Sequence, residues 1–223
     1  MIRAVMLDFD GVVLESAQLK TNIFRALFQE ICPDRVEEIV AYHLANAGIS
    51  RYVKFQTIYA ELLGWPLSEA DSQALGRRFS ALVEAELHRA SLVPGAREFL
   101  AQARPRYHVF VVSGMPQEEL HAIAKARHLF EWGDEWHGSP RTKPEIIEDI
   151  LERQHLPPEA AVLVGDARSD WQAAQATGIA FIGRTAQSSV VFAPSVEQIL
   201  DLWQLPEALN RLDARQMTRG GVR

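Results

Sequence analysis

Short apolar runs alternate along this chain with segments in which apolar residues recur every three or four positions. The apolar runs have the length and composition of buried β-strands, and we expect strands at residues 2–7, 108–112, 161–164 and 179–182. The periodic segments predict helices at residues 96–103, 118–127, 144–154 and 170–177. This alternation predicts an α/β fold, in which helices cover both faces of a Rossmann-like parallel sheet.

One long segment interrupts the alternation directly after the first strand. Over residues 16–90 the apolar positions keep helical spacing, and no convincing strand intervenes. We interpret this segment as an α-helical cap domain inserted into an α/β core domain, which is formed by residues 1–15 and 91–215. Residues 216–223 are polar and contain glycine, so we expect a flexible tail there.

Composition narrows the class of protein. The 223 residues are 48% hydrophobic, which suits one α/β domain with a small insertion. A net charge of −6 gives no basic footprint for nucleic acid or a membrane surface. The single cysteine, Cys32, excludes an intramolecular disulfide and favours a reducing compartment, so we expect a cytoplasmic protein. No run approaches the roughly 20 apolar residues of a membrane helix, and no signal peptide is expected. The oligomeric state stays open between monomer and homodimer.

The run Asp8-Phe9-Asp10-Gly11 stands where the first strand ends in a turn. Because side chains alternate along a strand, both aspartates can lie on the same side of the chain. Two like charges at that distance repel each other, and such pairs persist mainly where a cation or a shared proton relieves them. An ordinary Asx turn at a strand end is the alternative interpretation.

Two further segments place polar groups at a strand end and at a helix start. Ser113 and Gly114 follow the second strand, where a hydroxyl and backbone N–H groups can bind a phosphoryl oxygen; a plain serine cap is the alternative. Lys143 precedes a proline at a helix start, an unfavourable place for a cation. That cost is understandable if Lys143 points into an anionic site, although most lysines are solvated surface charges.

The strand at residues 161–164 ends in Gly165-Asp166, and Asp170 follows four residues later. One of these acids can be a helix cap, but capping does not explain why two acids recur at this strand end as well. Four aspartates, a lysine and a serine therefore gather at one edge of the predicted sheet. Hard oxygen ligands in this number suit Mg²⁺ together with a substrate phosphate. One carboxylate can then attack phosphorus while cations offset the charge.

The order of these motifs resembles the haloacid dehalogenase (HAD) superfamily, in particular its phosphoglycolate phosphatase and β-phosphoglucomutase-like branch with a helical cap. The resemblance implies that Asp8 is the nucleophile, which forms an aspartyl phosphate. It implies that Asp10 is the general acid and then the base, and that its backbone carbonyl binds Mg²⁺. The dehalogenases of the superfamily lack this second aspartate, so Asp10 argues for phosphate chemistry.

The same resemblance assigns the remaining motif residues. Asp166 would complete the metal site formed by Asp8 and Asp10. Asp170 would lie beside Asp166 or in the layer of residues that contact the metal ligands. Ser113 and Lys143 would hold the phosphoryl group as further catalytic residues, with Gly114 binding substrate next to Ser113.

The predicted cap contains a candidate substrate loop, Ala47-Gly48-Ile49-Ser50-Arg51. It is similar to Gly-Val-Ser-Arg loops of β-phosphoglucomutase-like proteins, in which the arginine meets an anionic or hydroxylated part of the substrate. An ordinary helix–helix turn with an exposed Arg51 carries equal weight. Lys20, one turn into the first cap helix, is a second candidate for facing the cleft. It stands where the mutases carry a histidine, which weakens the mutase interpretation.

The sequence thus predicts a Mg²⁺-dependent phosphoric monoester hydrolase. Its substrate is expected to be a small phosphorylated metabolite of the sugar phosphate or sugar-acid phosphate type. One alternative is a phosphosugar mutase of the β-phosphoglucomutase type, which retains phosphate on its product. A second alternative is a non-catalytic phosphate-binding protein. Release of free phosphate in the presence of Mg²⁺ separates the three.

Overall fold

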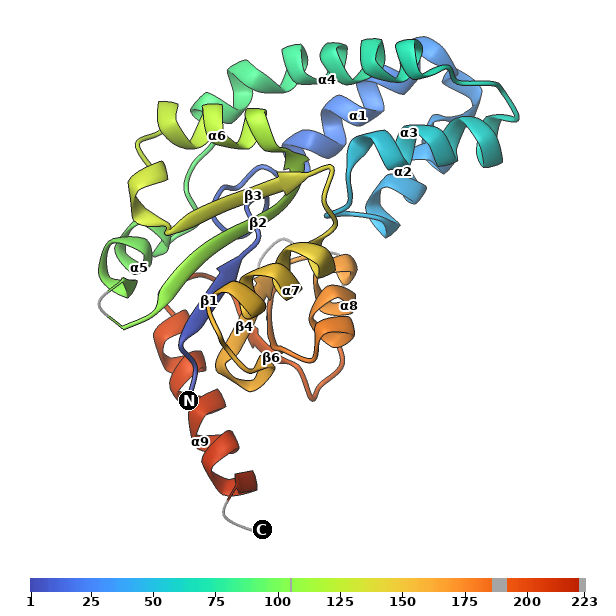
Figure 1. Ribbon diagram of the computed structural model, residues 1–223. Helices are drawn as coiled ribbons and strands as arrows, with labels where there is room; N and C mark the ends of the chain where they lie inside the picture. The colour runs from blue at the N-terminus through green and yellow to red at the C-terminus, as the bar shows by residue number, and fades with distance from the viewer. Residues whose placement is uncertain (105, 186–191, 221–223) are drawn as a thin grey trace.

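A parallel sheet forms the centre of the molecule (Figure 1). The computed structural model describes residues 1–104, 106–185 and 192–220. Within these residues the sheet has six strands in the order β3-β2-β1-β4-β5-β6, and every neighbouring pair is parallel. The strands are β1 (Ala4–Leu7), β2 (His108–Pro116), β3 (Glu135–Ser139), β4 (Ala161–Gly165), β5 (Ala180–Arg184) and β6 (Glu197–Ile199).

Alternation along the central strands divides the core between the two faces of the sheet. Val5 and Leu7 of β1 pack into a cluster that includes side chains of α5, α6 and α9. Ala4 and Met6 pack into a second cluster, with side chains of α7 and α8. These helices are α5 (Ala96–Ala103), α6 (Gln117–Ala126), α7 (Lys143–Arg153), α8 (Arg168–Thr177) and α9 (Leu205–Gly220). The predicted α/β class, a parallel sheet with helices on both faces, is therefore confirmed.

Helices alone follow β1 up to Arg89, as the spacing of apolar residues predicts. They are α1 (Ala17–Ile31), η1 (Pro33–Arg35), α2 (Val36–Ala45), α3 (Arg51–Thr57), the π-helical η2 (Ile58–Leu63) and α4 (Glu69–Arg89). Figure 1 shows them together beyond the carboxyl ends of the strands, with α4 reaching over α6. Their interior is aromatic: Phe24 packs against Phe28, Phe55 and Phe79, with ring centroids 5.0–6.1 Å apart.

Two strands and one helix were not predicted. β3 lies at one edge of the sheet and contains one large apolar side chain, Trp136, among polar and glycine residues. β6 forms the other edge with three residues. Short turns of helix, η3 (Phe130–Trp132) and η4 (Pro158–Ala160), precede β3 and β4. Edge strands need less apolar surface than central ones, so their sequences carry a weaker signal.

The C-terminal helix α9 extends into the segment that we expected to be a tail. It continues to Gly220, past the boundary that we expected at residue 216. The Gln216 side chain donates a hydrogen bond to the Glu159 carbonyl at 2.8 Å. The backbone N–H of Ile2 donates to Asp213 Oδ1 at 2.6 Å, which ties the start of the chain to α9. Residues 221–223 of the expected tail lie outside the described residues.

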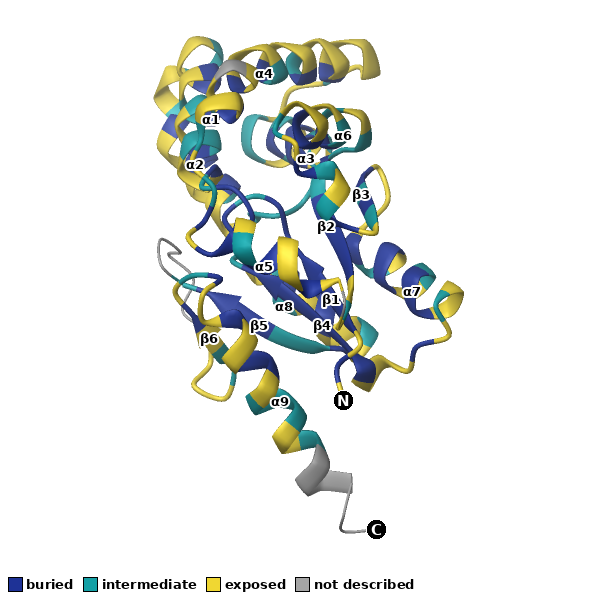
Figure 2. Cartoon of the chain, turned by 90° about the vertical axis from the view of Figure 1, so that its left-hand side faces the viewer, coloured by how far each residue is buried: buried dark blue, intermediate teal, exposed yellow. Residues whose placement is uncertain are grey.

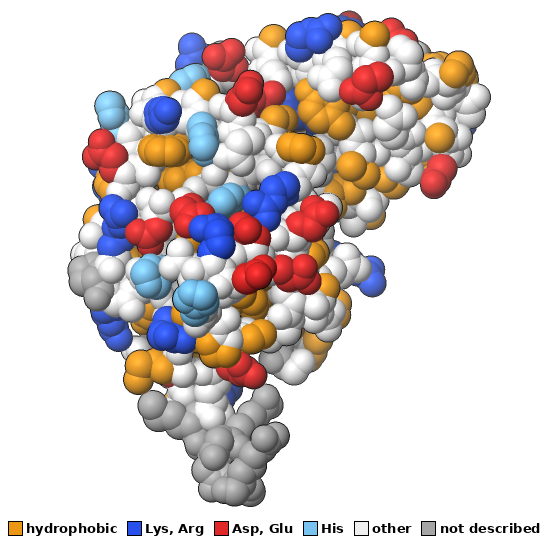
Figure 3. All heavy atoms as spheres, viewed as in Figure 1, with side chains coloured by type: hydrophobic (Ala, Val, Ile, Leu, Met, Phe, Trp, Pro, Cys, Tyr) orange, Lys and Arg blue, Asp and Glu red, His pale blue; other side chains and the backbone are white. Residues whose placement is uncertain are grey.

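Burial follows the layers, with dark strands inside and exposed outer faces on the helices (Figure 2). On the face shown in Figure 3, acidic and basic side chains are interspersed. Ion pairs at the protein surface join some of its charged side chains; Arg153, for example, contacts Glu135 and Asp149. Among the described residues, no helix has both the length and the apolar composition that a membrane crossing needs.

Candidate active site

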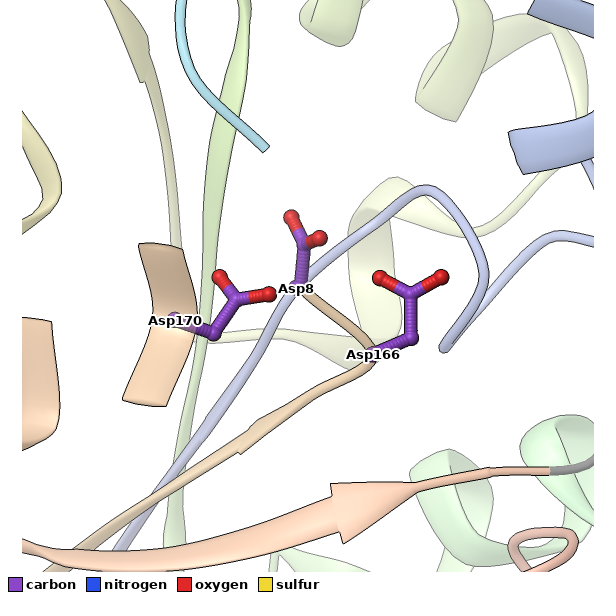
Figure 4. A group of neighbouring side chains, drawn as sticks. All are labelled: Asp8, Asp166 and Asp170. Carbon is purple, nitrogen blue, oxygen red and sulfur yellow. The ribbon is translucent and has the colours of Figure 1, made fainter. Parts of the chain in front are cut away.

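The acids of the first and last motifs meet because their strands are neighbours. β1 pairs with β4 in register, Leu7 against Val164, so Asp8 and Asp166 follow adjacent strand ends. The backbone N–H of Asp8 donates to the Val164 carbonyl at 2.9 Å. Asp170 comes from the first turn of α8. One carboxylate oxygen each from Asp8, Asp166 and Asp170 lie within 4.8 Å of one another (Figure 4).

Lys143 supplies the positive charge at this cluster. It begins α7, whose preceding residue Thr142 caps the helix in a capping box with Glu145. The Lys143 ammonium is buried, lies 2.9 Å from Asp8 Oδ1 and also bonds the Asp170 carboxylate. Burial opposes its charge, but the charges of Asp170 and Asp8 outweigh that effect and raise the pKa of Lys143 above its usual value.

Asp170 positions this lysine. One of its oxygens binds the Lys143 ammonium, and the other accepts a hydrogen bond from the backbone N–H of Ala167 at 3.0 Å. Both carboxylate oxygens are thus in use, and the side chain is fully buried. We therefore expect Asp170 to orient Lys143 rather than to bind substrate.

The cluster holds more negative charge than Lys143 can neutralise. Burial raises the pKa of Asp8 to about 7; Lys143 opposes the shift, and the charges of Asp170 and Asp10 add to it. Burial and the charges of Asp8 and Asp170 raise the pKa of Asp166 well above its ordinary value. Converging oxygen donors with excess negative charge fit a hard divalent cation such as Mg²⁺.

Gly11 allows the turn after β1 to lie against this cluster. Its φ is +74°, and a Cβ there would stand 2.0 Å from Asp166 Oδ2. Any other side chain would meet both backbone strain and this carboxylate. The glycine of the first motif is therefore required by close approach as well as by the turn.

The Asp10 carboxylate faces the helical segment instead of the cluster. It accepts hydrogen bonds from Ser16 Oγ and from Lys20 Nζ, both at 2.5 Å. Burial raises its pKa, but the Lys20 charge and the two hydrogen bonds outweigh burial, so the pKa of Asp10 lies below its ordinary value. Lys20 belongs to α1, so a helix of the predicted cap holds Asp10 in its ionised form.

Ser113 lies within β2, which runs farther than predicted, to Pro116. The pairing of β2 with β3 shifts register between Val112 and Pro116, as expected for a bulge that redirects side chains. Ser113 is buried, and its hydroxyl oxygen accepts from the Met115 backbone N–H at 3.1 Å.

The loop before α3, which contains Ala47 and Gly48, lies in close contact with the strand ends. Ser169 Oγ donates to the Ala47 carbonyl at 2.6 Å. A Cβ on Gly114 would lie 2.4 Å from the Gly48 carbonyl oxygen, and a Cβ on Gly48 would lie 2.4 Å from Ser169 Oγ. Gly48 also has a φ of +79°. Both glycines that we expected near the substrate thus permit this approach.

A cavity of about 240 Å³ lies between the strand ends and the helical segment. Asp8, Asp10 and Asp166 line it on the sheet side. The other predicted residues along it are Lys20, Gly48, Arg51 and Gly114. The volume is smaller than the roughly 300–1,000 Å³ of sites for drug-sized ligands, so it fits a small metabolite.

Arg51 lines the cavity, but its guanidinium is already engaged. It donates to Ser80 Oγ at 2.7 Å, pairs with the Glu119 carboxylate on α6, and lies 4.8 Å from the centre of the Phe79 ring. It thus ties the helical segment to the α/β layer. Sequence reasoning missed Glu119, because nothing in the local pattern of α6 marks it as a partner of a residue 68 positions away.

Arg184 and Glu15 form a second pair that the sequence did not reveal. The Arg184 side chain, at the end of β5, donates to the Gly11 carbonyl at 2.8 Å and to Glu15 at 2.6 Å. It holds the turn that carries Asp10. Its signal in the sequence was weak, a charged residue two positions after a predicted apolar strand.

Gly114→Ala should push the loop that contains Gly48 away from the strand ends while leaving the fold intact, because the new Cβ meets the Gly48 carbonyl. We expect kcat/KM for phosphate release to fall about 10- to 100-fold through misplacement of the closed site, with little change in Tm. Ser169→Ala removes a hydrogen bond without a clash and should cost only about 5-fold. A Gly114→Ala enzyme with unchanged kcat/KM would contradict the importance of this contact.

Comparison with known proteins places this arrangement in a family. The family model for haloacid dehalogenase-like hydrolases matches residues 2–178, which include all the motifs above. A phosphoglycolate phosphatase of Pseudomonas putida is 27% identical over 195 residues, covering 82% of this chain and 69% of that protein.

Solved structures share the fold. A predicted phosphoglycolate phosphatase from Haemophilus somnus superposes with a TM-score of 0.75 at 20% identity, covering 93% of this chain and 98% of the other. The HAD hydrolase YfnB of Bacillus subtilis, solved with bound magnesium, gives 0.68 at 18% identity, covering 94% and 99%. Because the family model spans most of the chain, the protein belongs to the haloacid dehalogenase-like hydrolases.

Proposed function

We propose that this hydrolase is a Mg²⁺-dependent phosphatase that acts on a small phosphorylated metabolite through an aspartyl-phosphate intermediate. The observation that carries the proposal is the cluster of Asp8, Asp166 and Asp170. Asp8 and Asp170 are buried and pair with Lys143, and Asp8 and Asp166 line a small cavity. The name of the Pseudomonas putida relative supports a phosphatase rather than a mutase.

In the first half-reaction an Asp8 oxygen attacks phosphorus, the ester P–O bond breaks, and the leaving alcohol takes a proton from Asp10. In the second, Asp10 takes a proton from water, which attacks the phosphoryl group and releases inorganic phosphate and free Asp8. The contacts of Asp10 with Lys20 and Ser16 favour its ionised form, which suits the base of the second half-reaction. To act as the acid of the first half-reaction, Asp10 has to take up a proton before the ester P–O bond breaks.

Lys143 reduces the repulsion between Asp8 and the incoming phosphate, because its ammonium lies against the Asp8 carboxylate. Ser113, at the bulge of β2, is proposed to hold a phosphoryl oxygen together with the backbone near Gly114. Mg²⁺, held by Asp8, Asp166 and the Asp10 carbonyl, would supply further charge neutralisation.

We also propose that residues 16–90 act as a cap domain over a core of residues 1–15 and 91–215. The contacts of Lys20 with Asp10 and of Arg51 with Glu119 support this division, since each joins the two parts at the cavity. A cap that closes in this way excludes water from the phosphoryl group. A cytoplasmic location is part of the proposal and rests on the single cysteine.

The proposal is tested by incubating the purified protein with a panel of phosphorylated metabolites, with Mg²⁺ or with EDTA. We expect inorganic phosphate to be released only with Mg²⁺. Conversion of glucose 1-phosphate to glucose 6-phosphate, dependent on a bisphosphate and without phosphate release, would favour the mutase instead. Binding of phosphate without any turnover would overturn an enzymatic role.

Mg²⁺ should also stabilise the fold, because it relieves repulsion among the clustered carboxylates. At a concentration 100 times its Kd, the gain is about 2.7 kcal/mol. That gain corresponds to a rise in Tm of roughly 5–10 °C for a chain of this size. Asp166→Asn should raise the Tm in EDTA, because it removes one of the repelling charges, and should abolish the response to Mg²⁺. Differential scanning calorimetry measures both, and an unchanged Mg²⁺ response in Asp166→Asn would remove Asp166 from the metal site.

A further inference from the structure

The cationic side chains that line the cavity differ in how their charge is balanced. They are Lys20, Arg51, Lys54 and Arg184. Lys20 pairs with Asp10, Arg51 with Glu119 and Arg184 with Glu15. Within the described part of the chain, no carboxylate lies at ion-pair distance from Lys54. The one cation of this set without a counter-ion thus faces the space where substrate is proposed to bind.

Lys54 is also deeply buried. It lies on α3 with 4% of its surface exposed. Its ammonium is 3.4 Å from both the ring Nδ1 and the backbone carbonyl of His43 on α2. A buried ammonium with two long contacts and no counter-ion is costly, because it loses its hydration without full replacement. An unfavourable group of this kind is most often found at functional sites, where a bound ligand can supply the missing counter-charge.

His43 holds this lysine in place. Its ring packs on Phe24, with the centroids 4.2 Å apart. Burial and the charges of Lys54 and Lys20 lower the pKa of His43 to about 2, so the ring is neutral and can accept from the ammonium. Burial and the Lys20 charge lower the pKa of Lys54 to about 7, and an anion beside it would reverse that shift.

We propose that Lys54, oriented by His43, binds a second anionic group of the substrate, a carboxylate or a second phosphate. The inference rests on the proposed phosphatase function, which places the reacting phosphoryl group at Asp8, a residue at the end of β1 that lines the same cavity. Phe24 and Phe79 line the cavity as well and offer apolar contact to a carbon backbone. The substrate class is therefore a phosphomonoester that carries another anion, rather than a neutral sugar monophosphate.

Matched pairs of esters test this. The acids 2-phosphoglycolate and 3-phosphoglycerate are compared with 2-hydroxyethyl phosphate and glycerol 3-phosphate, in which CH₂OH replaces the carboxylate. Fructose 1,6-bisphosphate is compared with fructose 6-phosphate for the second phosphate. Wild type should prefer the anionic member of at least one pair by about 10- to 100-fold in kcat/KM, the value of a charge-assisted hydrogen bond. The pair that shows it identifies carboxylate or phosphate.

Lys54→Met should remove that preference, Lys54→Arg should keep more of it, and the exposed Lys125→Met serves as the matched control with an unchanged ratio. Because Lys54→Met removes an uncompensated buried charge, its Tm should be at least that of wild type, which shows that it folds. Equal loss on both members of a pair, or no anionic preference in wild type, would overturn the inference while phosphate release still supports the phosphatase. No release from any ester would overturn the phosphatase proposal and this inference with it.

Discussion

Asp8→Asn should abolish phosphate release, lowering kcat on the order of 10⁴-fold or more, as is usual when a covalent nucleophile is removed. The amide has nearly the shape of the carboxylate and can still accept a hydrogen bond from Lys143, but its oxygen is too weak a nucleophile to attack a phosphate ester. Because burial makes ionised Asp8 costly, its removal should not lower the Tm in EDTA. Steady-state phosphate release and calorimetry measure the two effects.

A matched control and a direct probe separate the nucleophile from a general effect of charge. Asp34→Asn changes an exposed aspartate and should leave kcat unchanged. In wild type, acid quenching during turnover followed by mass spectrometry should find one phosphoryl group on the peptide that contains Asp8. Substantial turnover by Asp8→Asn, or a phosphoryl group on another residue, would assign the nucleophile elsewhere.

The sequence could predict those parts of the fold whose signal is local. The central strands β1, β2 and β4 are buried on both faces and are therefore continuous apolar runs. The helices beside them carry one apolar stripe each. The edge strands β3 and β6 escaped detection because each contains a single large apolar side chain, Trp136 and Ile199 respectively. Helix α9 escaped as well, and its connection to the first residues depends on contacts between opposite ends of the chain.

The same distinction applies to the site. Asp8, Ser113 and Asp166 could be recognised because the carboxyl ends of parallel strands share one edge of a sheet, so each strand end is a candidate by position. The residues that contact the side chains of the helical segment could not be recognised in this way. Glu119 meets Arg51, and Lys54 meets His43, through tertiary packing that leaves no periodic or motif signal in either partner. Predicting that Arg51 faces the cavity was possible, whereas its engagement with Glu119 was not.

Charge is distributed unequally across the cavity, and this has a consequence for binding. The strand ends contribute mainly carboxylates, whereas the helical segment contributes Lys20, Arg51 and Lys54. A phosphate ester placed between them meets repulsion on one side and attraction on the other. Lys143 and a metal ion are therefore needed on the sheet side before the ester can approach Asp8. Removal of Lys143 is consequently expected to affect both catalysis and folding.

Lys143→Met should lower kcat/KM on the order of 10²–10³-fold, the usual cost of losing a charge donor to the reacting group. It should also destabilise the protein by about 3–5 kcal/mol near pH 8, because it leaves Asp8 and Asp170 buried without their counter-ion. Urea unfolding in EDTA measures the loss. The exposed Lys125→Met should show none of it.

The stability that Lys143→Met loses should depend on pH in a defined direction. The pKa of Asp8 is about 7 in the folded protein against an ordinary 3.8, so its ionisation opposes folding increasingly as pH rises between these values. Without Lys143 the pKa of Asp8 rises further, and the penalty extends to higher pH. The difference in free energy of unfolding between wild type and Lys143→Met should thus grow from pH 6 to pH 8. Adding Asp170→Asn to Lys143→Met removes one of the two buried carboxylates that lack a counter-ion, and should recover part of the lost stability. A loss that is independent of pH, or fully additive in the double variant, would mean that Lys143 acts through packing and not through its charge.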